Sequence, residues 1–235
     1  MIDRLVMSIT PDSREYPPLL REIPDRPSRL YVVNPIIDWG SAVPVAIAGT
    51  REPTPFGINL TRKVVKALIY EGFEPIVTGA ARGIDTIAIN TATEYGEASV
   101  KVPPCILEER IDPSVEKISE HLCTGAWQSR VSGWLVERNR IVVGMSYALI
   151  VTEVKVTKPD WRRRGTACCG TYHAVRYAKQ YGRPVYVITP QWELLRKQYD
   201  AGAFEEAFTL ITNAGAEPVR DVDELIKELK QAVRR

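Results

Sequence analysis

The sequence predicts an α/β protein in three layers, a mostly parallel β-sheet with helices on both faces. From residue 43 onward, apolar stretches of strand length alternate with amphipathic stretches of helix length. The strand-length stretches, such as 45–48 and 184–188, are apolar throughout, which is typical of parallel strands buried on both faces. Small-residue turns follow two successive strands. Together these observations favour an open, doubly covered sheet.

The first forty residues are predicted to form a lead-in, or N-terminal cap, rather than a domain. Prolines recur in residues 1–40, which end with a strand-like segment, LYVV, at 30–33. Residues 41–235 are predicted to form a single domain. In chain order, strands are expected at 45–49, 75–79, 98–102, 148–153, 184–188 and 216–219, and helices at 57–71, 84–95, 135–145, 172–181, 204–213 and 222–233. The stretch 105–130 carries no clear pattern.

Composition excludes several classes of protein. The chain has 235 residues, 45% of them hydrophobic, which is enough for a sizeable core. No apolar run approaches the ~18 residues of a membrane span, and the first residues are too weakly apolar for a signal peptide. We therefore expect a cytoplasmic protein without membrane contact. Four cysteines without C-x-x-C spacing and only two histidines predict no metal site, and we expect no cofactor.

Positive charge is concentrated in one part of the chain although the net charge is only +2. Between residues 154 and 198, ten lysines and arginines stand against two acidic residues. Such a block is expected either for a polyanionic partner or for a solvated helix face. Both interpretations stay open from the sequence.

The two small-residue turns are the strongest functional signal. VAIAGTRE at 45–52 and PIVTGAARGID at 75–85 are apolar strands, each running into a turn that bears an arginine. Such turns let backbone N–H groups gather around one point, at which the following helix directs its positive dipole end. Because parallel strands place their carboxyl ends at one edge, Arg51 and Arg82 are expected to reach a single polyanionic ligand.

A dinucleotide cofactor fits these turns poorly. The Rossmann fingerprint requires G-x-G-x-x-G at the first turn and an acidic residue at the end of the second strand. Here the first turn is Gly49-Thr50-Arg51 and the second strand ends with Thr78-Gly79. The sequence therefore predicts a Rossmann-like fold without a nicotinamide cofactor.

The order of motifs resembles the DNA-processing protein A (DprA/Smf) family. YPPLLREIPDRPSRLY at 16–31 is similar to the YP-x-x-L segment that precedes the family's domain. VAIAGTR at 45–51, TGAARGID at 78–85 and RNRIVVGMS at 138–146 match its three central motifs. The tail LITNAGAEPVRDVDEL at 210–225 is similar to its closing strand and helix.

This resemblance implies an extended Rossmann fold that binds single-stranded DNA, often as a homodimer. In bacteria the family protects incoming strands during transformation and helps to load the recombinase RecA, so a RecA-like recombinase is an implied partner. The chain departs from the family's pattern at 102–114 and 123–127, has a longer loop at 155–169, and is expected to lack the family's winged-helix domain. DNA binding is therefore a firmer expectation than a role in competence.

The expected binding residues combine arginines, turn glycines and hydroxyl groups. In the long loop, Trp161 is a candidate for base stacking, or an anchor of its own loop, beside Arg162, Arg163 and Arg164. Alternatively, Arg138 and Arg140 pair with Asp85 or Glu153 to hold the fold. Asp85 is expected to cap a helix. The candidate phosphate-binding residues are Gly49, Thr50, Arg51, Thr78, Gly79, Ala81, Arg82, Gly83, Arg138, Asn139, Arg140, Gly170 and Thr171.

No catalytic set converges on these turns, so the chain is predicted not to be an enzyme. The alternative is a sensor or enzyme for a small nucleotide, because the related phosphoribohydrolases also hold a phosphate at such turns. Their motif P-G-G-x-G-T-x-x-E is matched only by CGTYHAV at 169–175, which lacks the glutamate. A protein-binding scaffold is a third possibility that the sequence leaves open.

Overall fold

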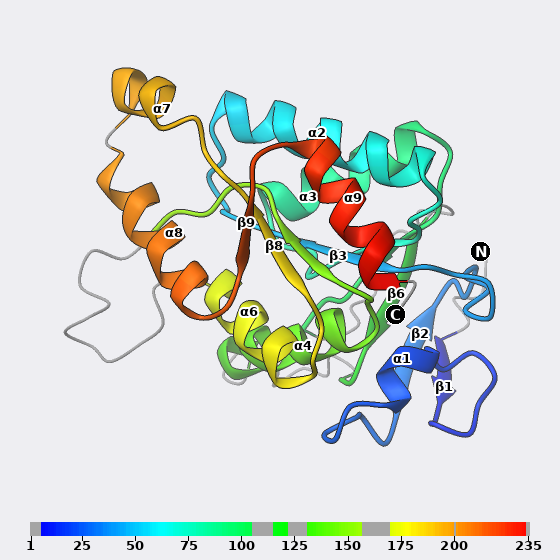
Figure 1. The fold of residues 1–235 in the computed structure, drawn as a ribbon. Helices are drawn as coiled ribbons and strands as arrows, with labels where there is room; N and C mark the ends of the chain where they lie inside the picture. The colour runs from blue at the N-terminus through cyan, green and yellow to red at the C-terminus, as the bar shows by residue number, and fades with distance from the viewer. Residues whose placement is uncertain (1–5, 105–114, 122–130, 157–169, 200, 234–235) are drawn as a thin grey trace.

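The computed structural model describes residues 6–104, 115–121, 131–156, 170–199 and 201–233. In this part of the chain nine strands form one sheet (Figure 1). Seven of them are parallel, from β6 through β9, while β1 and β2 add two antiparallel strands at one edge. The strands are β1 (Val6–Ile9), β2 (Leu30–Val33), β3 (Val45–Ala48), β4 (Ile76–Thr78), β5 (Ser99–Lys101), β6 (Val115–Ser119), β7 (Leu149–Val151), β8 (Val185–Ile188) and β9 (Glu217–Val219).

The strand order creates a switch point next to β3. The sheet reads β1-β2-β6-β5-β4-β3-β7-β8-β9, so the chain moves outward from β3 to β6 and then returns to the other side of β3 with β7. In open parallel sheets, the loops leaving such a pair diverge and form a crevice at the carboxyl ends of the strands. The order therefore places the crevice beside the turns after β3 and β7.

Helices cover both faces of the sheet (Figure 1). Along β3, Val45 and Ile47 pack into the core under α2, α3 and α9, whereas Ala46 packs into the core under α4, α6 and α8. This alternation is the period of two of a β-strand, with both faces apolar. The described helices are α1 (Pro18–Arg21), α2 (Pro55–Tyr70), α3 (Ile84–Glu94), α4 (Val131–Gly144), α6 (Gly170–Gln180), α7 (Trp192–Gln198), α8 (Gly202–Asn213) and α9 (Val222–Val233).

Local sequence signals account for the ends of two helices that matter here. Thr54 caps α2, because its Oγ1 accepts a hydrogen bond from the Gly57 N–H at 3.1 Å, and Pro55 occupies the first helical position. The predicted turn after α8 is confirmed, since Ala214 is the C-cap and Gly215 has a φ of +105°. These ends fix where α2 leaves the crevice and where the chain enters β9.

The predicted fold class is confirmed, and the strands and helices predicted from residue 43 onward agree with the observed ones to within a few residues. The short strand β1, the strand β6 in the stretch without a clear pattern, and the helix α7 were not predicted. Each is short, at four, five and seven residues. Too few residues repeat in them for a period to be visible in the sequence. Among the described helices, none combines the length and apolar character needed to cross a membrane.

Candidate functional site

The turns after β3, β4 and β7 are joined by backbone hydrogen bonds. The Thr50 N–H donates to the carbonyl of Glu153, just after β7, at 2.9 Å, and the Ile84 N–H donates to the carbonyl of Thr50 at 3.1 Å. The turn after β3 is thus bonded both to the chain leaving β7 and to the first residue of α3. The structure brings Gly49–Arg51 and Gly79–Gly83 together at the carboxyl edge of the sheet, as the sequence predicted.

Close contact between these turns explains two of the glycines. Gly83 has a φ of +82°, and a Cβ there would lie 2.4 Å from the carbonyl oxygen of Thr50. A Cβ on Gly49 would lie 2.6 Å from the carbonyl oxygen of Glu153. Real Cβ atoms do not approach backbone oxygens this closely, so both positions require glycine. Gly170, by contrast, has nothing within 4 Å of a Cβ among the described residues and no positive φ, so no contact that the structure describes requires glycine there.

The buried side chain of Asp85 stabilises the turn after β4. Its buried carboxylate accepts a hydrogen bond from the Ala81 N–H at 3.1 Å, just before α3 begins. Burial raises the pKa of Asp85 to about 6, against the opposing influence of Arg138 and Arg51. The carboxylate is therefore mostly ionised at neutral pH, and its charge is compensated by those two arginines.

Arg138 is a buried cation behind the turn rather than an exposed contact. Its Nη1 donates to the carbonyl of Val102 at 2.7 Å, and its guanidinium occupies the space where a Cβ of Gly79 would lie. Burial lowers its pKa to about 10, so it is protonated at neutral pH. Its Nε has no hydrogen-bond partner among the described residues. Of the two readings left open for Arg138, its position beside Asp85 favours a role in holding the turn.

The two residues after Arg138 connect other elements to the site. Arg140 pairs with Glu120, which follows β6, at 2.5 Å, and not with Asp85 or Glu153. The Asn139 Nδ2 donates to the carbonyl of Gly170 at 3.3 Å, and the Thr171 hydroxyl donates to the carbonyl of Gly49 at 3.3 Å. Asn139 and Thr171 thus tie α4 and the start of α6 to the turn after β3.

Arg51 and Arg82 differ in whether an acidic residue already pairs with them. Arg51 is exposed and forms no hydrogen bond or ion pair with any residue that the structure describes. The Arg82 side chain is 73% exposed but pairs with Glu52 at 3.2 Å, and Lys155 lies 4.0 Å from the other oxygen of the same carboxylate. Arg51 is therefore ready to meet an anion, while Arg82 shares its charge with Glu52.

Glu153 was considered in the sequence only as an ion-pair partner, and the structure gives it another role. Its buried carboxylate accepts hydrogen bonds from the N–H of Thr54 at 2.9 Å and from the Thr54 hydroxyl at 2.6 Å. Burial raises the pKa of Glu153. It anchors the first turn of α2 next to the crevice. An acidic residue directly after a buried strand is the signal for such a role, although it does not identify the partner.

The other predicted site residues have structural contacts or lie outside the described part. The Thr78 hydroxyl accepts a hydrogen bond from the Ala80 N–H at 3.2 Å. The loop candidates Trp161, Arg162, Arg163 and Arg164 lie outside the described residues. Among the residues that are described, no group of three or more His, Cys, Asp or Glu side chains is arranged to hold a metal ion.

Comparison with known proteins identifies the family. The family model described as DNA recombination-mediator protein A matches residues 7–230. The chain belongs to this family. A curated member, protein Smf of Synechocystis, is 30% identical over 193 residues, which cover 77% of this chain. The matched part spans 45% of the length of that relative.

Two solved structures of DNA processing protein A have the same fold as this family member. The Helicobacter pylori protein superposes with a TM-score of 0.72 at 21% identity, covering 96% of this chain and 97% of that one. The Streptococcus pneumoniae protein gives a TM-score of 0.73 at 23% identity, covering 95% and 74%. The H. pylori structure is described in terms of the single-stranded DNA binding mode of that protein. At this level of identity the two structures confirm the fold.

Proposed function

We propose that this protein binds single-stranded DNA, with the phosphate backbone held at the carboxyl edge of β3, β4 and β7. The observation that carries the proposal is the exposed Arg51, which lies without a described partner in the turn at the switch point of the sheet. A phosphate there meets the guanidinium of Arg51 and the N-terminal ends of the helices that start at this edge. The membership of the chain in a recombination-mediator family supports DNA as the source of that phosphate.

The surroundings of Arg51 suit a strand of phosphates better than a single small ligand. Arg82 and Lys155 lie on either side of Glu52, so a phosphate that displaces this carboxylate gains two further cations. Buried Arg138 balances the charge of Asp85 behind the turn, so this carboxylate does not repel a phosphate. Because phosphate contacts carry no base information, we expect binding that is largely independent of sequence. The turn residues identified from the sequence are proposed to contact the phosphates. Arg138, Asn139 and Arg140 are proposed to support these turns on the side away from the ligand.

The cellular role follows as part of the same proposal. We infer a cytoplasmic protein that acts without catalysis, passes bound single strands to a RecA-like recombinase and works as a homodimer. Light scattering of the purified chain tests the dimer, and co-precipitation with the recombinase of the same organism tests the partner.

The binding proposal is tested by titrating fluorescently labelled oligo-dT and a duplex of equal length with the protein at two salt concentrations. We expect tighter binding to the single strand and a steep loss of affinity with salt, because each phosphate held releases counterions. Equal affinity for duplex and single strand, or no binding at low salt, would contradict the proposal. Release of free base from nucleoside monophosphates would instead favour the small-nucleotide enzyme.

A further inference from the structure

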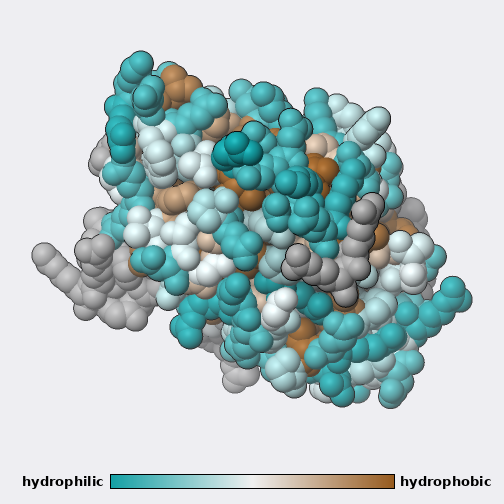
Figure 2. All heavy atoms as spheres, viewed as in Figure 1, coloured by the Kyte–Doolittle hydropathy of each residue, from teal (hydrophilic) through white to brown (hydrophobic). Residues whose placement is uncertain are grey.

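A groove between α2 and α9 is separate from the site described above. Both helices cover the same face of the sheet and start at its carboxyl edge, because each follows a parallel strand (Figure 1). The groove between them is open, with a volume of about 1000 Å³. In the space-filling view, hydrophilic residues cover most of these two helices and hydrophobic residues show between them (Figure 2). The groove thus has polar rims and an apolar floor.

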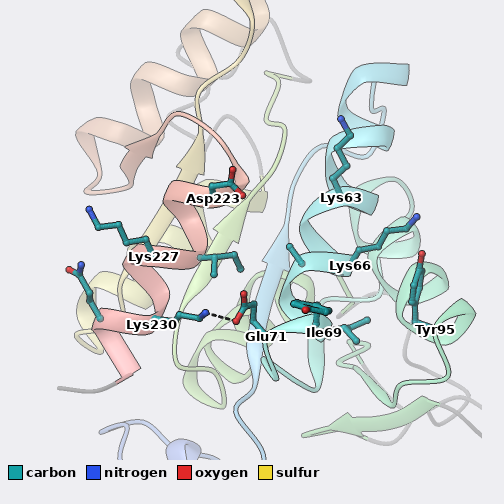
Figure 3. Close-up of a pocket in the computed structure, with 12 residues that line it drawn as sticks. Lys63, Lys66, Ile69, Glu71, Tyr95, Asp223, Lys227 and Lys230 are labelled. Carbon is teal, nitrogen blue, oxygen red and sulfur yellow. Dashed lines mark ion pairs between the residues drawn. The ribbon is translucent and has the colours of Figure 1, made fainter.

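Lysines dominate the charge of the groove. Four lysines and two acidic residues line it, and one of the acidic residues, Glu71, is paired with Lys230 at the end away from the carboxyl edge (Figure 3). Lys63 and Lys227, one on each helix, form no ion pair with any described residue. The groove therefore presents an excess of positive charge that the described part of the chain does not compensate.

Two tyrosines lie at the same groove and are unusually exposed. Tyr70 is 88% exposed and Tyr95 is 49% exposed. The Lys66 Nζ lies 5.2 Å from the centroid of the Tyr95 ring, so this cation and this ring face each other (Figure 3). Lys63, Lys66 and Tyr70 follow one another at intervals of three and four residues, which places them along one face of α2.

Exposed rings among unpaired lysines are the combination by which proteins hold single strands, since the lysines meet phosphates and the rings stack on bases. We propose that the groove between α2 and α9 is a second contact surface for single-stranded nucleic acid. The inference rests on the proposed function, because it extends the same ligand from the carboxyl edge along α2. An acidic peptide is the competing occupant, but its carboxylates would gain nothing from the Tyr70 ring, which is 88% exposed.

The test is a matched pair of charge reversals in the full chain. The double variant Lys63→Glu/Lys227→Glu changes the groove, while Arg14→Glu/Arg29→Glu makes the same change of charge on exposed residues of the N-terminal segment. For labelled dT30 we expect the slope of log affinity against log salt to fall by about 1.4 in the groove variant, at about 0.7 per phosphate. The wild type then loses about sevenfold more affinity than this variant over a fourfold rise in salt. The control should keep the wild-type slope.

Photo-crosslinking with bromodeoxyuridine-substituted dT30 locates the strand independently of affinity. Adducts on Tyr70 or Tyr95 are expected, and their loss in the groove variant supports the proposal. Equal slopes for groove and control variants, with adducts confined to other residues, overturn it. A labelled oligo-glutamate that binds the wild type but not the groove variant, with dT30 binding unchanged, also overturns it.

The experiment tests the site at the carboxyl edge and the groove independently of each other. If Arg51→Ala leaves dT30 binding unchanged while the groove variant weakens it, the site at the carboxyl edge is wrong and the groove stands. If only Arg51→Ala weakens binding, the groove is wrong and the proposed function stands.

Discussion

Three arginines that look equivalent in the sequence have different environments and roles in the structure. Arg51 is exposed and has no described partner, Arg138 is buried behind the Gly79 turn, and Arg140 is engaged with Glu120. All three lie in motifs that resemble one family pattern, but a motif does not show which side of a helix or turn faces the ligand. Burial decides this: an exposed arginine can meet a new anion at little cost, whereas a buried one already balances its surroundings.

The contact between the two turns is tested at Gly83. Gly83→Ala is expected to lower the free energy of unfolding by about 3 kcal/mol, because it adds a clash with Thr50 to the strain of a positive φ. Gly96→Ala is the control for a positive φ without a clash, since Gly96 has a φ of +77° but nothing within 4 Å of its Cβ position, whereas Gly83 also has a ψ of −129°. The control should lose about 1 kcal/mol, the conformational part alone. Urea unfolding measures both, and equal losses would show that the turns do not press against each other.

Most strands and helices could be predicted from the sequence, but the side-chain hydrogen bonds that join them could not. Apolar strands, helix periods and glycine turns are local signals, and they predicted β3 to β5 and β7 to β9 with the helices between them, except α7. Glu153 holding Thr54, and Asn139 reaching Gly170, join residues 99 and 31 positions apart. No local pattern encodes such a partner, because many polar residues at strand ends have the same immediate neighbours in sequence. The antiparallel strand β1 was missed for another reason, since its four residues are too few to show a period.

Glu116 joins two elements and makes that junction sensitive to pH. This buried carboxylate on β6 accepts hydrogen bonds from the N–H groups of Ile36 at 2.9 Å and Ile37 at 3.0 Å, which follow β2. Burial raises its pKa to about 7, well above the ordinary value of 4.5. The folded state therefore holds a proton that the unfolded state has released between about pH 4.5 and 7.

The sign of this effect gives a prediction for Glu116→Gln. The contribution of Glu116 to stability is largest below pH 4.5 and is lost as the pH rises through 7. Relative to the non-titrating Gln variant, the wild type should lose about 3 kcal/mol of unfolding free energy between pH 4 and pH 8. Urea unfolding of both proteins across this range measures the difference. A difference that does not change with pH would contradict a buried, raised-pKa carboxyl at this junction.

For the whole molecule, the strand order concentrates the chemistry at one edge. The return of the chain from β6 to β7 puts the turns after β3, β4 and β7 in contact, and β8 and β9 then bring α9 back beside α2. The sequence motifs indicated the first of these sites, because glycines and arginines mark it. The lysines and tyrosines of the groove come from α2, from the end of α3 and from α9, and they belong to no motif. Only the folded structure brings these three segments together.

We propose that phosphates of a single strand bind at Arg51. The salt dependence of dT30 binding by the Arg51→Ala variant tests this most directly. Arg14→Ala serves as the control for an exposed arginine elsewhere. We predict that Arg51→Ala weakens binding to dT30 and to a mixed-sequence strand equally, and lowers the salt slope by about 0.7, the share of one phosphate. An affinity and a slope equal to those of the wild type and of Arg14→Ala would contradict it.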